Sequence, residues 1–178
     1  YEFLSNGEFT FEFVDKAGNK GTATAIVDWI DTTAPSAKIE YDIKSLTNKD
    51  VTASISFDEE NVTVRNNDGK TNYVFTENGE FIFEFQDAAG NTGSIIAKVD
   101  WIDKVAPKAQ ITYSTLKSTN QPVVATITFD KQNVTITNNK GSNTYTFVQN
   151  GEFTFEFKDK AGNIGKATAN VEWIDKIQ

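Results

Sequence analysis

Hydrophobic residues recur at every second position through most of the chain, with Thr, Ser, Lys and Glu between them. A period of two is typical of strands that bury one face and expose the other to solvent. In the middle of the chain these runs are Ala37–Tyr41, Val51–Phe57, Val62–Val64, Tyr73–Phe75, Phe81–Phe85 and Ile95–Trp101. Turn sequences such as Asn67-Asp68-Gly69 and Asn78-Gly79 separate the runs. No stretch has helical periodicity, so the pattern predicts an all-β protein.

The same pattern returns along the chain with a fixed offset. The string Asn-Gly-Glu-Phe begins at Asn6, Asn78 and Asn150, and each start is 72 residues from the next. Pro35 and Pro107 follow the segments that end in Trp-Ile-Asp, where proline interrupts ladder hydrogen bonding. We therefore place repeat boundaries near residues 33 and 105. Residues 1–33 are then the C-terminal part of one repeat, and residues 34–105 and 106–178 are two complete repeats.

Six or seven short antiparallel strands with alternating inward residues must bury one face against a second sheet. The prediction is therefore an array of small β-sandwiches with immunoglobulin-like packing. Three tryptophans lie in phase with the inward residues of the last strand of each repeat, and we expect them in the core. They are Trp29, Trp101 and Trp173.

Composition removes several classes of chemistry. Histidine and cysteine are absent, which excludes Ser–His and Cys–His catalytic pairs, His- or Cys-ligated zinc and disulfides. The formal charge is −8, which disfavours nucleic acid as a partner, and no apolar run is long enough for membrane insertion. The chain begins at Tyr1, and we expect it to be a piece of a longer protein.

One set of motifs carries a family resemblance. Asn-Gly-Glu-Phe-Thr-Phe-Glu-Phe at 6–13 and 150–157 leads into Asp-x-Ala-Gly-Asn, then Trp-Ile-Asp and Ala-Pro. This succession resembles the tandem bacterial immunoglobulin-like repeats of Gram-positive cell-surface proteins and adhesins, over the whole chain. The resemblance implies an extracellular location at the bacterial cell surface or cell wall, and a stalk or adhesive role.

The Asp-x-Ala-Gly-Asn motif admits two interpretations. Its oxygens suit calcium, but the spacing matches no EF-hand loop. A tight structural turn is the favoured interpretation, with Asp accepting backbone N–H bonds and with Gly and Asn tolerating positive φ. The turn residues are Asp15, Gly18, Asn19, Asp87, Gly90, Asn91, Asp159, Gly162 and Asn163.

Carboxylates at the repeat ends are the better candidates for calcium, which would stiffen the junctions. They are Asp28, Asp31, Asp100, Asp103, Glu172 and Asp175. Asp58-Glu59-Glu60 adds three more acids, but the related residues are Asp130-Lys131-Gln132, so this acidic run is not a repeated feature. Solvated carboxylates are the simpler expectation for Asp28, Asp100 and Glu172. Calcium apart, no cofactor is expected.

Residues 1–32 contain only the last strands of a repeat, so Phe9, Phe11, Phe13, Val27 and Trp29 would lie along uncovered edges. Excision from a longer array explains this arrangement. The alternative is strand complementation, in which this segment completes another copy and the chain self-associates.

The leading functional prediction is a non-enzymatic stalk or spacer of a bacterial cell-surface protein that projects a distal functional region. Neighbouring repeats of the same chain are then its partners. One alternative is an adhesive module that binds a host protein or glycan. Another is a set of accessory repeats in a secreted hydrolase.

Overall fold

The computed structural model describes residues 1–176, and nearly all of its regular structure is strand. The strands are β1 Gly7–Val14, β2 Lys20–Val27, β3 Ala37–Tyr41, β4 Val51–Phe57, β5 Thr63–Val64, β6 Asn72–Phe75, β7 Gly79–Gln86, β8 Thr92–Val99, β9 Ala109–Tyr113, β10 Val123–Phe129, β11 Thr135–Ile136, β12 Thr144–Phe147, β13 Gly151–Lys158 and β14 Ile164–Val171. Two short 3-10 helices are η1 Asn67–Gly69 and η2 Asn139–Gly141. Within these residues, no helix has the length and apolar character to cross a membrane. The all-β prediction is confirmed.

The chain divides into two compact units. The first unit comprises residues 1–40, 53–73 and 80–97, and the second comprises residues 41–52, 74–79 and 98–178. The division runs through the predicted repeat 34–105, whose strands contribute to both units. The boundaries near residues 33 and 105 stay predictions.

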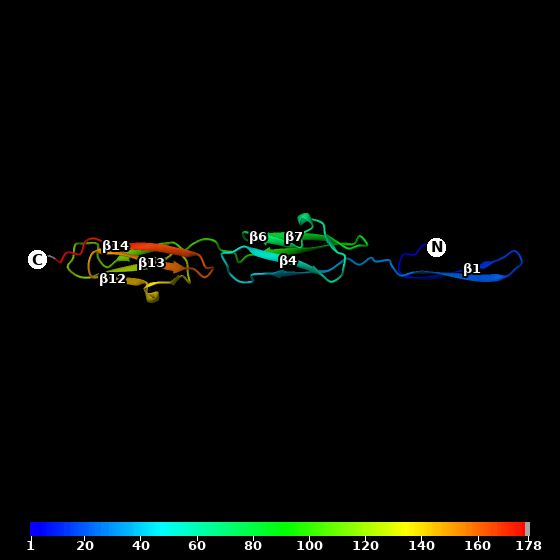
Figure 1. Cartoon of the computed structure of the whole chain (residues 1–178), viewed down its shortest axis with the longest axis horizontal. Coiled ribbons are helices and arrows are strands. Elements are labelled where there is room, and N and C mark those ends of the chain that lie inside the picture. The colour runs from blue at the N-terminus through cyan, green and yellow to red at the C-terminus, as the bar shows by residue number, and fades with distance from the viewer. Residues whose placement is uncertain (177–178) are drawn as a thin grey trace. The chain divides into compact units, whose positions relative to one another are not determined.

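The second unit contains a complete sandwich of two three-stranded sheets. One sheet has the order β12-β10-β9 and the other has the order β11-β13-β14. Figure 1 traces β13 and β14 in orange and red at the C-terminal end of the chain. In the long β13–β14 pairing, Phe155 lies opposite Ala167 and Phe157 lies opposite Gly165. A large ring thus faces a small residue at each of these two inward positions.

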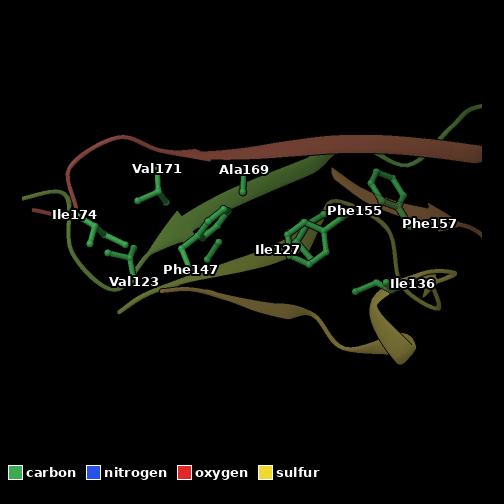
Figure 2. Packing of buried hydrophobic residues seen from close by; sticks show 10 residues of the cluster. Val123, Ile127, Ile136, Phe147, Phe155, Phe157, Ala169, Val171 and Ile174 are labelled. Carbon is green, nitrogen blue, oxygen red and sulfur yellow. The ribbon is translucent and has the colours of Figure 1, made fainter. Parts of the chain in front are cut away.

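The core of this sandwich lies between its two sheets, where the side chains point toward one another (Figure 2). Burial alternates along the strands, as period-two patterning requires: Phe155 and Phe157 are buried on β13, while the residues beside them are not. The buried cluster consists of Val123, Ala125, Ile127, Ile136, Phe147, Phe155, Phe157, Ala169, Val171 and Ile174. These are the large inward residues that the sequence pattern assigns to a sandwich core.

A glycine is required opposite Phe157. A Cβ atom on Gly165 would lie 2.8 Å from Cζ of the Phe157 ring, which is closer than real Cβ contacts. The ring therefore lies directly over the backbone of β14. The same pairing recurs in the first unit, where a Cβ on Gly93 would meet the Phe85 ring and lie 3.0 Å from the carbonyl oxygen of Pro35.

The first unit includes the hairpin of β1 and β2, which pair only with each other. Strands from the middle of the chain form two further sheets, with the orders β3-β4-β6 and β5-β7-β8. The hairpin exposes apolar side chains, as expected for a partial repeat: Phe13 is 56% exposed and Trp29 is 74% exposed.

The core assignment of Trp29 is therefore wrong in this structure, because no strand equivalent to β3 or β9 covers it. Trp173 is half-buried and packs against the core of the second unit. Its indole Nε1 donates a hydrogen bond to the carbonyl oxygen of Thr115 (3.0 Å), and its ring packs edge-on against Tyr113. Trp101 is also half-buried and donates to the carbonyl oxygen of Ile43 (2.9 Å).

Candidate functional site

Each Asp-x-Ala-Gly-Asn motif forms a tight turn around its aspartate. In the last copy, Oδ1 of Asp159 accepts the backbone N–H of Asn163 (2.9 Å), and Oδ2 accepts the Asn163 side-chain amide (3.0 Å). Gly162 has φ +97°, a conformation that glycine adopts without a steric cost. Asn163 is not among the residues with positive φ, contrary to the conformational role expected for it. Its contribution is its side-chain amide.

That amide also connects the turn to the segment before the linker proline. Nδ2 of Asn163 donates to the backbone carbonyl of Asp103 (2.8 Å), and Nδ2 of Asn91 donates to that of Asp31 (3.2 Å). Asp103 and Asp31 have matching local turns, because Oδ1 of each accepts the backbone N–H two residues later. The same framework is therefore built twice, 72 residues apart, with one unit containing each copy.

In the second unit, a lysine lies between the two aspartates of this framework. We define the lysine cluster as Asp103, Lys131 and Asp159. Nζ of Lys131 is 2.8 Å from Oδ2 of Asp103 and 3.1 Å from Oδ2 of Asp159, and it also donates to the carbonyl oxygen of Val105. The ammonium thus binds three oxygens, two of them charged.

The electrostatics of the lysine cluster favour the ionised forms. Hydrogen bonding to Asp103 raises the pKa of Lys131 despite partial desolvation, and hydrogen bonding to Lys131 lowers the pKa of Asp103. Burial works to raise the pKa of Asp159, but hydrogen bonds from Asn163 and Lys131 outweigh it, and the pKa is lowered. The cluster is an ion pair with two carboxylates at neutral pH.

In the first unit, the related positions hold three acids. We define the acidic cluster as Asp31, Glu59 and Asp87. One carboxylate oxygen from each lies within 4.8 Å of the others. Asp87 is buried, at 7% exposure, whereas Asp31 and Glu59 are exposed. Desolvation, together with the charges of Asp87, Asp31 and Asp58, raises the pKa of Glu59.

The pKa of Asp87 shifts the other way. Burial works to raise it, but hydrogen bonds from the Asn91 side chain and backbone and from the Gly90 N–H hold it below its ordinary value. Asp87 is therefore anionic at neutral pH, and Glu59 bears the cost of the like charges. Three oxygen ligands of this kind suit a hard divalent cation.

Among the acids expected at the junctions, the structure brings Asp31 and Asp103 into the two clusters. Asp28, Asp100 and Glu172 are exposed and belong to neither cluster. Sequence reasoning assigned Asp87 and Asp159 to the turn alone and set aside the run containing Glu59, because the run is not repeated. The available signal was the reversal of charge from Glu59 to Lys131 between two conserved repeat positions, Asp31/Asp103 and Asp87/Asp159.

Comparison with known proteins addresses the family directly. A family model described as bacterial Ig-like domain matches residues 23–104 and again residues 98–176. The chain belongs to this family. The resemblance noted from its motifs and the prediction of tandem immunoglobulin-like sandwiches are thereby confirmed.

No curated protein matches the chain. One similar solved structure, reported for host cell surface retention of a 1.5-MDa bacterial ice-binding adhesin, is 16% identical with a TM-score of 0.42. The match covers 90% of this chain and 71% of that chain. Two successive bacterial Ig-like domains support a module of a surface protein, in a family that is generally non-enzymatic.

Proposed function

We propose that the chain is a non-enzymatic spacer of an extracellular bacterial surface protein, whose repeats hold a distal functional region away from the cell. The observation that carries the proposal is the hydrogen bond from each turn asparagine to the aspartate carbonyl before the linker, Asn91 to Asp31 and Asn163 to Asp103. A contact that recurs with the repeat gives every added repeat the same attachment to the one before it.

A further contact of this kind supports the proposal. The backbone N–H of Asn48 donates to the carbonyl oxygen of Ala161 (3.0 Å), so a loop of residues 34–105 reaches the turn of residues 106–178. Pro35 and Pro107 are both buried, which restricts the linkers where the repeats meet. Attachment at several points limits bending, which is what a spacer needs.

Small-angle X-ray scattering tests the proposal by adding a repeat. The full chain is compared with a variant that carries a second copy of residues 34–105 inserted in register. A spacer gains at least about 26 Å in maximum dimension, the length of an eight-residue strand, with its cross-section unchanged. An unchanged maximum dimension with a larger cross-section would mean that the repeats fold back on one another, and the proposal would fail.

A further inference from the structure

The two clusters share a scaffold atom for atom in their hydrogen bonds. Asp31 and Asp103 each cap the turn into the linker, and Asp87 and Asp159 each hold an asparagine amide. The only member that changes chemical type is the third one, which is Glu59 in one cluster and Lys131 in the other. The lysine cluster therefore shows what this scaffold binds when the partner is part of the chain.

What it binds is a cation. The Lys131 ammonium is held by Asp103, by Asp159 and by the carbonyl oxygen of Val105. The residues at the related positions are Asp31, Asp87 and Thr33, which supply two carboxylates and one carbonyl. In the acidic cluster, Glu59 removes the ammonium and contributes a third carboxylate within 4.8 Å of the other two.

We propose that the acidic cluster of Asp31, Glu59 and Asp87 binds a divalent metal cation, of which Ca²⁺ is the best fit, in the place that the Lys131 ammonium takes in the lysine cluster. Carboxylate and carbonyl oxygens are the ligands of a hard cation, and Ca²⁺ accepts irregular sets of them together with water. The exposure of Asp31 and Glu59 leaves room for that water.

The charge of the cluster supports the same assignment. Three carboxylates gathered around a buried aspartate repel one another, and the raised pKa of Glu59 records that repulsion. A divalent cation would neutralise it, as the single ammonium does for the two carboxylates of the lysine cluster. One framework is thus braced by a tethered cation and its repeat-related copy by a dissolved one.

Isothermal titration calorimetry of the full chain with CaCl₂, repeated with MgCl₂, tests the proposal. The expected result is one Ca²⁺ per chain, with a dissociation constant of about 10⁻⁴–10⁻³ M, as in extracellular calcium modules, and weaker binding of Mg²⁺. Glu59→Gln should weaken binding at least about tenfold, because it removes one charged ligand. Glu60→Gln, at the exposed neighbouring acid, is the matched control and should bind as the parent does.

Two results would overturn the proposal: no heat of binding at about 10⁻² M CaCl₂, well above that range, or binding by Glu59→Gln equal to that of the Glu60→Gln control. Circular dichroism of each variant verifies that it is folded. The outcome is independent of the spacer proposal, because the scattering experiment measures length in a fixed buffer and the titration measures an ion. A spacer without a metal site and a metal site without a spacer role are distinguishable results.

Discussion

The acidic cluster and the lysine cluster are the same construction with opposite charges at one position. Both use an aspartate before the linker and an aspartate in the following turn, joined through an asparagine amide. Lys131 supplies the counter-charge in one copy, and Glu59 adds to the negative charge in the other. A single side chain therefore decides whether this part of the repeat carries its own cation or depends on one from the medium.

The largest expected effect comes from removing the turn aspartate in the lysine cluster. Asp159→Ala leaves the Asn163 backbone N–H and amide without their acceptor and deprives Lys131 of one of its two carboxylates. We expect a fall in melting temperature on the order of 10 °C in EDTA, measured by calorimetry.

Asp87→Ala is the matched variant in the acidic cluster. It loses the same turn hydrogen bonds, but it also relieves the repulsion among the three acids, so its melting temperature in EDTA should fall less. Equal losses for the two variants would show that only the turn matters and that the cluster charges have no effect on stability.

A smaller effect, with opposite signs in the two clusters, follows from changing the third member. In EDTA, Lys131→Met should lower the melting temperature by about 5 °C, because it leaves Asp103 and the buried Asp159 facing each other without a cation. Glu59→Gln should raise it, because one of three like charges is removed. A lowered melting temperature for Glu59→Gln in EDTA would contradict this account of the acidic cluster.

The smallest effect is a difference in pH dependence, again in EDTA. The lowered pKa of Asp103 means that its ion pair stabilises the fold above the ordinary value of 3.8, and that this contribution is lost as the pH falls through the folded-state pKa. The destabilising effect of Lys131→Met should therefore be constant near neutral pH and shrink below 3.8.

Glu59 behaves in the opposite sense, because its pKa is raised. Below its ordinary value of 4.5 it is protonated in both states, and stability is lost as the pH rises through the raised folded-state pKa. The gain from Glu59→Gln should thus be present at neutral pH and vanish below 4.5. Thermal melts of the three chains across this range provide the measurement, and parallel curves would refute the assignment of Glu59.

The alternation of residues such as Phe155 and Phe157 was sufficient to predict the strands and the core, because a period of two has one structural meaning over so many short runs. Asp31 and Asp103 were also found from the sequence, since they adjoin the linker prolines. Burial of Trp29 was expected from its phase in the repeat, yet burial depends on strands that residues 1–33 do not contain.

The clusters themselves could not be read from the sequence in the same way. Glu59 and Asp87 are 28 residues apart and meet Asp31 only when the turn, the linker and the end of β4 are folded together. Local patterns contain no information about such a meeting. The replacement of Glu59 by Lys131 was taken as the absence of a repeated feature, whereas the structure shows the lysine bound by the same pair of aspartates.

The most direct test of the central claim is to exchange the third members and count bound calcium by equilibrium dialysis. The account predicts one Ca²⁺ for the parent chain, none for Glu59→Lys and two for Lys131→Glu, because each substitution converts one cluster into the other. Calcium binding that persists in Glu59→Lys, or fails to increase in Lys131→Glu, would contradict the claim that the ammonium and the metal cation occupy the same place.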